Sequence, residues 1–211
     1  GQSRLVVSER NSYLRGESYW PRLALFSMAH AVVANSLAQS DWLRERVPWL
    51  KHSACCIYNG LDPSRFAPRP GLLEPAERPA QGEAQRYDRL LVIGRVSRQK
   101  NGDALVASLQ LFHDQHGFCP KLTWVGRTDE PEARARIEAR LEACPAVKAN
   151  WQWLGERNDI PALLASHDAL ILPSLFEGLP NVVCESLAVG VPVVASHVCD
   201  HPLLVPSGER G

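Results

Sequence analysis

Short apolar runs alternate with longer polar or amphipathic stretches along nearly the whole chain. Buried parallel strands read as continuous apolar runs, because helices cover both faces of their sheet. The runs that predict strands are 5–7, 31–34, 55–58, 90–93, 122–125, 151–154, 169–172 and 191–195. The stretches that predict helices are 17–28, 40–46, 103–113, 130–143, 160–166 and 180–188. The alternation indicates an α/β protein with doubly wound, mainly parallel sheets.

The composition changes between residues 63 and 86, where five prolines lie among glycine, alanine and charged residues. Such a stretch predicts a linker or a long surface loop. The sequence therefore predicts a first part over 1–62, a linker over 63–86 and a second α/β part over 87–211. In the first part, Ser40 or Asp41 is the expected cap of the helix over 40–46.

Two acids, Glu177 and Glu185, are separated by seven residues, and a Gly-Leu-Pro turn follows the first. Pro180 suits the first turn of a helix, because its missing N–H costs nothing there. The free N–H groups of such a helix start attract anions, phosphates in particular. The segment therefore offers a phosphate-binding helix start and two carboxylates that can accept hydrogen bonds from hydroxyl groups. This combination suits a nucleotide-sugar. The spacing of the acids alone also fits a helix cap and a surface residue.

A basic loop follows the predicted strand 90–93, where Gly94 precedes Arg95, Arg98 and Lys100. Ligands of open α/β sheets bind beyond the carboxyl ends of the strands. Arginine is a planar bidentate donor and lysine a mobile point charge, so this loop can neutralise a diphosphate. Taken alone, the loop also fits a solvated basic turn. Together with the glutamate segment, which also follows a strand, it favours diphosphate binding.

Composition and missing motifs exclude several classes of function. The 23 basic and 23 acidic residues leave a formal net charge of zero, so no bulk field attracts nucleic acid or anionic lipid. The sequence has no G-x-G-x-x-G, Walker A or G-x-S-x-G run, which argues against nicotinamide enzymes, P-loop ATPases and esterases. His113 and His116 lie three apart near the end of a predicted helix and are expected to face solvent, so we expect no metal site. Six cysteines mostly in or beside apolar runs, with no N-x-S/T sequon, indicate a reduced cytoplasmic compartment.

Taken together, the motifs resemble the GT-B glycosyltransferases of family 4. The resemblance rests on Asn59-Gly60-Leu61-Asp62, on Gly94-Arg95 with Gln99-Lys100, on residues 173–181 with Glu185, and on residues 190–195. It covers nearly the whole chain in the order of the family and is strongest in the second half. Asn101 departs from the family pattern, which often continues Lys-Gly after the lysine.

The resemblance implies two Rossmann-like domains and a retaining transfer from a nucleotide-sugar, without metal or another cofactor. It implies catalytic roles for three residues: Arg95 and Lys100 hold the donor diphosphate, and Glu177 contacts the hydroxyls of the donor sugar. Glu185 would bind the ribose. The other implied donor-binding positions are Gly94, Gly178, Leu179, Asn181 and Val182.

The resemblance also sets expectations about the extent of the chain. Residues 1–62 are similar only to the last part of the acceptor-side domain, and the final crossing helix of the family has no counterpart. We therefore expect a fragment that is inactive by itself, comprising the end of the N-terminal domain and most of the C-terminal donor-binding domain.

The full-length protein would transfer a hexose or N-acetylhexosamine to a glycan or lipid-linked acceptor. We expect it in the cytoplasm, and peripheral association with the inner face of the membrane is compatible with this. A nucleotide-sugar epimerase of GT-B architecture and a non-catalytic nucleotide-sugar-binding subunit remain alternatives.

Overall fold

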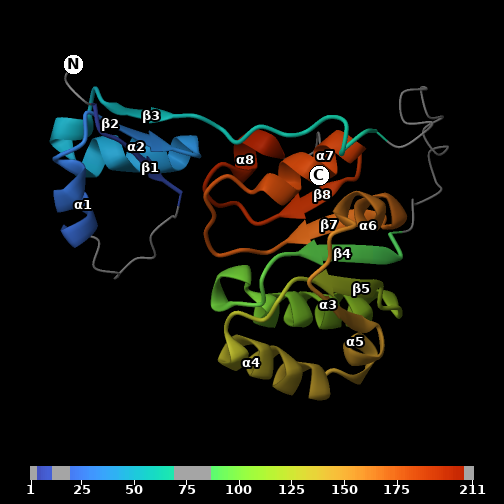
Figure 1. Cartoon of the computed structure of the whole chain (residues 1–211). Helices are drawn as coiled ribbons and strands as arrows, with labels where there is room; N and C mark the ends of the chain where they lie inside the picture. The colour runs from blue at the N-terminus through green and yellow to red at the C-terminus, as the bar shows by residue number, and fades with distance from the viewer. Residues whose placement is uncertain (1–3, 11–19, 69–86, 207–211) are drawn as a thin grey trace. The chain divides into compact units, whose positions relative to one another are not determined.

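A computed structural model describes residues 4–10, 20–68 and 87–206 of the chain (Figure 1). Contacts divide the chain into two compact units, and each is described by itself. The first unit gathers residues 1–60, 176–181 and 197–204, and the second gathers 61–175, 182–196 and 205–211. The predicted parts are contiguous in sequence, whereas the first unit includes two short segments from late in the chain. Residues 69–86 of the predicted linker lie outside the described residues.

The first unit contains a three-stranded parallel sheet in the order β1-β2-β3. Its strands are β1 (Val6–Glu9), β2 (Ala31–Ala34) and β3 (Ala54–Cys56). Its helices are α1 (Trp20–Phe26), α2 (Leu37–Arg46), the 3₁₀ turn η1 (Pro48–Leu50) and α8 (His201–Leu204). Glu9 is in register with Ala34, and Ala34 with Cys56, so the three strands end at the same edge of the sheet.

Helix α2 begins three residues before the predicted start, and the expected cap at Ser40 or Asp41 is wrong. Ser36 is the cap, and its Oγ accepts a hydrogen bond from the backbone N–H of Gln39 at 3.3 Å. Ser40 is instead fully buried inside the helix. Serine occurs both at position 36 and at position 40. Only Ser36 has the extended backbone that the cap geometry requires.

The second unit contains a five-stranded parallel sheet in the order β6-β5-β4-β7-β8 (Figure 1). Its strands are β4 (Arg89–Ile93), β5 (Lys121–Val125), β6 (Trp151–Gly155), β7 (Ala169–Leu172) and β8 (Val193–Ala195). Its helices are η2 (Arg98–Lys100), α3 (Gly102–His116), α4 (Pro131–Glu142), α5 (Pro145–Ala149), α6 (Ile160–Ser166) and α7 (Asn181–Val189). The predicted α/β class with doubly wound parallel sheets is confirmed.

The sheet of the second unit is covered on both faces. Leu90 and Val92 of β4 belong to the core cluster that includes side chains of α3, α4 and α5. Leu91 lies between them and points to the opposite face, yet it too is fully buried. Burial of both faces explains why these strands are continuous apolar runs. Trp151 and Trp153 of β6 pack against the ring of Trp124 on β5, with ring centroids 5.9 and 5.3 Å away.

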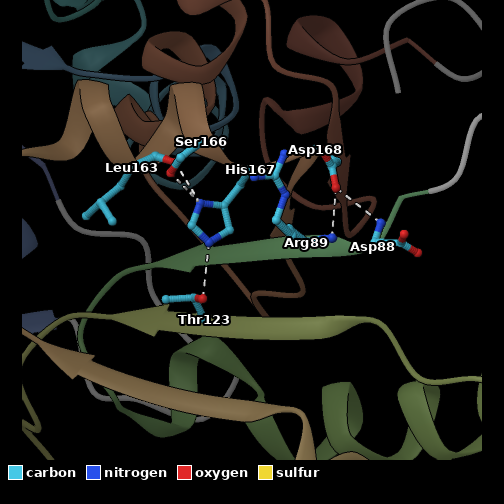
Figure 2. Close-up of polar contacts among 7 residues, drawn as sticks. All are labelled: Asp88, Arg89, Thr123, Leu163, Ser166, His167 and Asp168. Carbon is cyan, nitrogen blue, oxygen red and sulfur yellow. Dashed lines mark hydrogen bonds and ion pairs between the residues drawn. The ribbon is translucent and has the colours of Figure 1, made fainter.

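Asp168 organises the amino ends of two neighbouring strands in the second unit (Figure 2). Its carboxylate accepts hydrogen bonds from the backbone N–H groups of Asp88 at 3.1 Å and Arg89 at 2.8 Å, and it pairs with the Arg89 guanidinium at 3.1 Å. Partial burial works to raise the pKa of Asp168, but the hydrogen bonds from Arg89 outweigh it and hold the pKa below its ordinary value. This carboxylate therefore supports the fold at the edge opposite the motif loops.

His167 links helix α6 to the sheet beside Asp168 (Figure 2). Its Nδ1 lies 2.7 Å from the carbonyl oxygen of Leu163, and its Nε2 lies 3.1 Å from Oγ1 of Thr123 on β5. The two ring nitrogens thus contact an α6 carbonyl and a β5 hydroxyl. His167 and Asp168 are structural residues of the fold.

Candidate functional site

The two motif loops of the second unit follow adjacent strands, β4 and β7. The backbone N–H of Leu175 donates a hydrogen bond to the carbonyl of Gln99 at 2.8 Å. This bond joins the loop after β7 to η2, which carries Lys100. The structure therefore brings together the basic loop and the start of the glutamate segment at the carboxyl edge of the sheet. Ligands of open parallel sheets bind at this edge.

The side chain of Lys100 lies directly over Gly94. A Cβ at position 94 would be 2.7 Å from Cε and 3.2 Å from Nζ of Lys100. Glycine at 94 therefore leaves the room in which the lysine chain lies, at the point where β4 ends. The sequence predicted both residues as donor-binding, and the structure places them in contact.

Asn101 ends the η2 turn in the left-handed conformation, with φ 53°. Glycine adopts this conformation most easily, and asparagine is among the few other residues that tolerate it. This explains how the chain accommodates Asn101 at a position where the family often has glycine. The residue at position 101 therefore differs from the family pattern, but the backbone turn that follows Lys100 is kept.

Arg95 forms an ion pair with Asp129, at 2.7 Å between Nη1 and Oδ2. Arg127 binds the other carboxylate oxygen at 2.7 Å, so two arginines share one acid. Partial burial works to raise the pKa of Asp129, but hydrogen bonds from Arg95 and Arg127 keep it below its ordinary value. Since more than half of the Arg95 side chain is exposed, its guanidinium remains accessible to an anion. Nothing in the sequence pattern indicated Asp129 as its partner.

Glu185 lies on α7, which begins at Asn181, one residue later than predicted. Pro180 directly precedes the first turn, and Val182 follows the helix start. Partial burial raises the pKa of Glu185 above its ordinary value, and the charge of Arg65 lowers it only in part. A half-buried carboxylate of this kind can accept hydrogen bonds from hydroxyl groups of a ligand.

The segment Glu177–Asn181 packs within the first unit. A Cβ at Gly178 would be 2.8 Å from Oδ1 of Asn35 and 3.0 Å from the carbonyl oxygen of Arg10. Asn181 Oδ1 accepts a hydrogen bond from Nδ2 of Asn59 at 2.8 Å. Glycine at 178 is therefore required by close approach to other parts of the chain.

Two further residues of this segment are largely buried. Glu177 donates its backbone N–H to Sγ of Cys199 at 3.4 Å, and the residue is 8% exposed. Leu179 is equally buried. The backbone of the segment is thus fixed on both sides of Gly178.

Asp200 is a residue whose role the sequence did not indicate. Its carboxylate accepts hydrogen bonds from the backbone N–H groups of Leu37 at 2.6 Å and Ala38 at 2.7 Å, at the start of α2. The hydroxyl of Tyr58 donates to the same carboxylate at 3.0 Å. Asp200 therefore ties the segment 197–204 to α2 within the first unit. The carboxylate of Asp200 is therefore a tertiary cap of helix α2.

Two features are absent from the described ranges. Within them, no group of three or more His, Cys, Asp or Glu side chains is placed to hold a metal ion. Likewise, no helix there is both long and apolar enough to cross a membrane. That the protein needs no metal stays a prediction.

Comparison with known sequences gives consistent matches. The profile of the family described as glycosyl transferases group 1 matches residues 87–211. EpsF of Bacillus subtilis (strain 168), a protein named as a glycosyltransferase, is 30% identical over 212 residues, which cover 92% of this chain and 50% of EpsF. An Escherichia coli enzyme, UDP-Gal:alpha-D-GlcNAc-diphosphoundecaprenol alpha-1,3-galactosyltransferase, is 28% identical over 155 residues, or 74% of this chain and 39% of the enzyme.

Solved structures share the fold. HepE from Anabaena in complex with UDP and glucose superposes with a TM-score of 0.77 at 22% identity, covering 97% of this chain and 56% of HepE. Sucrose-phosphate synthase from Thermosynechococcus elongatus gives a TM-score of 0.72 at 22% identity, covering 94% of this chain and 51% of the synthase.

The sequence and structural matches agree on fold and family. The chain spans about half the length of the curated relatives it matches, or less. The family match covers residues 87–211, which is more than half of the chain. The motifs that follow β4 and β7 lie within this matched region. The chain therefore belongs to the glycosyl transferases group 1 family and has a GT-B type fold.

Proposed function

We propose that the full-length protein is a retaining glycosyltransferase that moves a hexose or N-acetylhexosamine from a nucleotide-sugar to a glycan or lipid-linked acceptor. The observation that carries the proposal is the Leu175–Gln99 backbone hydrogen bond, which joins the two motif loops at the carboxyl ends of β4 and β7. Family membership supports transfer as the reaction class.

The second unit supplies the groups for the nucleotide part of the donor. Lys100 and Arg95 bind the diphosphate, and the first N–H groups of α7 add partial positive charge. Glu185 accepts hydrogen bonds from the ribose hydroxyls. As the glycosidic bond breaks, negative charge develops on the leaving diphosphate and the sugar gains oxocarbenium character. Cations and helix N–H groups already in place stabilise this charge without reorganising.

The Glu177 segment supplies the groups for the sugar. The Glu177 carboxylate accepts hydrogen bonds from sugar hydroxyls, and the backbone near Gly178 approaches the donor closely. Fixing of this backbone within the first unit supports such a role, because a positioned donor lowers the entropic part of the barrier.

The relatives suggest which donors to test first. The E. coli enzyme is named for UDP-Gal, and HepE was solved with UDP and with UDP-glucose. We propose a UDP-hexose or UDP-N-acetylhexosamine as donor and a reaction in the cytoplasm, at the inner face of the membrane when the acceptor is lipid-linked. No metal is needed in this proposal, because cationic side chains neutralise the diphosphate.

The test uses the full-length protein with a panel of nucleotide-sugars, each with and without acceptor, and with and without a chelator. We expect acceptor-dependent release of nucleoside diphosphate, retention of the anomeric configuration, and a change of less than about twofold with chelator. Isomerised donor or free sugar without acceptor would show an epimerase instead. Binding without any turnover would show a non-catalytic subunit.

A further inference from the structure

The loop after β5 is joined to the basic loop after β4 within the second unit. The fully buried Val96 donates its backbone N–H to the carbonyl of Arg127 at 2.8 Å. Its own carbonyl accepts hydrogen bonds from the backbone N–H groups of Asp129 and Glu130, each at 3.2 Å. These bonds fix the backbone that carries Asp129 relative to the strand end that carries Arg95.

The guanidinium of Arg95 is held at one side and open at the other. Its Nη1 donates to Oδ2 of Asp129 at 2.7 Å. Among the described residues, the Arg95 side chain makes no other hydrogen bond or ion pair. The Asp129 side chain is 24% exposed and that of Arg95 is 58% exposed. Since a guanidinium has five N–H donors, the remaining donors of Arg95 can bind an anion while the ion pair stays formed.

Holding Arg95 in advance has a consequence for ligand binding. A long side chain loses rotamer freedom when a ligand orders it, and a side chain that is already ordered loses less. The carboxylate that orders Arg95 is itself negative, however, and would repel a diphosphate nearby. Arg127 offsets this repulsion, because its Nε binds the other oxygen of Asp129 at 2.7 Å. Two guanidinium groups and one carboxylate leave the three side chains with one net positive charge.

We propose that Asp129 is a positioning residue for diphosphate binding, which holds Arg95 in place while Arg127 neutralises the holding carboxylate. The proposal rests on the proposed function, in which Arg95 binds the donor diphosphate. It adds two residues from the loop after β5, outside both motif loops. Neither Asp129 nor Arg127 has to touch the donor for this role.

The experiment measures the sign of the change in affinity when Asp129 loses its charge, by calorimetry with UDP on the full-length protein. If charge alone mattered, Asp129→Asn would bind the anion more tightly. We expect weaker binding instead, by about two- to tenfold, the range for ordering one long side chain. Glu142→Gln is the matched control, since it removes a carboxylate that pairs with Lys148 at the far end of α4, and it should leave the affinity unchanged.

Three further variants show whether the effect passes through Arg95. Adding Asp129→Asn to Arg95→Ala should cause no further loss, because no guanidinium remains to be held. A merely structural role of Asp129 would weaken binding in both backgrounds. Asp129→Glu keeps a carboxylate and should recover part of the affinity that Asp129→Asn loses. Arg127→Ala leaves the carboxylate unneutralised and should weaken binding, but less than Arg95→Ala.

The outcomes separate this inference from the proposed function. Unchanged or tighter binding in Asp129→Asn would overturn the inference, and tighter binding would show that Asp129 competes with the diphosphate for Arg95. A further loss in the Arg95→Ala background would also overturn it and assign Asp129 to the fold of the loops. In these cases the diphosphate role of Arg95 stands, provided that Arg95→Ala weakens UDP binding. Unchanged affinity in Arg95→Ala would remove that role from the proposed function, and this inference with it.

Discussion

The side chain of Lys100 lies across Gly94 so closely that a Cβ at position 94 would be 2.7 Å from the lysine Cε. Gly94 directly follows the last residue of β4 and has a φ of 156°. Lys100 is the last residue of the η2 turn, six residues later. The glycine and the lysine of the basic motif therefore act as one spatial unit. A change at either residue affects where the ammonium group lies.

Gly94→Ala should therefore weaken binding of nucleoside diphosphate about as much as Lys100→Ala, although it removes no charge. The added methyl group must displace the lysine chain from its place beside the end of β4. Calorimetry on both variants checks this. Gly117→Ala is the control, since that glycine also has positive φ but an added Cβ there meets nothing within 4 Å. Normal affinity in Gly94→Ala with a lost affinity in Lys100→Ala would contradict the shared role.

Lys100→Ala should weaken nucleoside-diphosphate binding by about 1.5–3 kcal/mol, the range for hydrogen bonds to charged groups. Lys148→Ala removes the same charge from α5, where Lys148 pairs with Glu142, and should have no effect.

Arg95→Ala should weaken binding more than Arg127→Ala, although both arginines bind Asp129. Equal effects of the two arginine changes would indicate that they act only through the fold around Asp129.

The two glutamates should differ in the part of the donor that they recognise. Glu185→Ala should weaken nucleoside diphosphate and whole donor alike, because both ligands contain the ribose. Glu177→Ala should weaken the whole donor and leave nucleoside diphosphate nearly unchanged. The comparison requires affinities for both ligands in both variants. If Glu177→Ala weakened both ligands and Glu185→Ala only the whole donor, the two assignments would be exchanged. Equal losses of affinity for both ligands in both variants would contradict both assignments.

Binding through Glu185 should depend on pH. The carboxylate must be ionised to accept from two hydroxyls, and burial raises its pKa above the ordinary value of about 4.3. Nucleoside-diphosphate affinity should therefore fall as the pH is lowered through this raised pKa, before an ordinary glutamate would protonate. Glu185→Gln should bind more weakly at neutral pH and lose this dependence. A Glu185→Gln variant with an unchanged pH profile would assign the titration to another group.

Stability at low pH should depend on Asp168. Its pKa is lowered in the folded state, so its contribution is present above the unfolded pKa of about 3.9 and is lost as the pH falls through the folded value. Asp168→Asn should lower unfolding free energy at neutral pH by about 1–2 kcal/mol, because a neutral amide oxygen accepts more weakly than a carboxylate. Urea unfolding at pH 7 and at pH 3 should show a difference between the proteins that shrinks in acid. A constant difference would show that packing, not charge, causes it.

Much of the fold was predictable from local pattern. The helix at Ile160–Ser166 and the strands at Ala31–Ala34 and Ala169–Leu172 have the predicted bounds. Buried parallel strands must be apolar on both faces, and helices must alternate with them. Both features are therefore visible as a pattern of apolar and amphipathic segments in the sequence. The motif loops also lie at the carboxyl ends of strands, since that follows from the order of elements along the chain. Small helices such as Pro145–Ala149 were missed because five residues carry too little periodicity.

The tertiary structure alone decided the partners of the site residues. Asp200 caps a helix whose first residues lie 162 and 163 positions earlier, Asp129 holds Arg95, and the amide of Asn35 lies against Gly178. Such contacts join residues with no periodic or neighbouring relation, and an acid, an amide or a glycine has the same appearance in sequence whichever partner it meets. The sequence by itself determined which chemical groups the chain presents after each strand. Folding determined which groups meet, because hydrogen bonds and close contacts depend on distances in space that separation along the chain does not set.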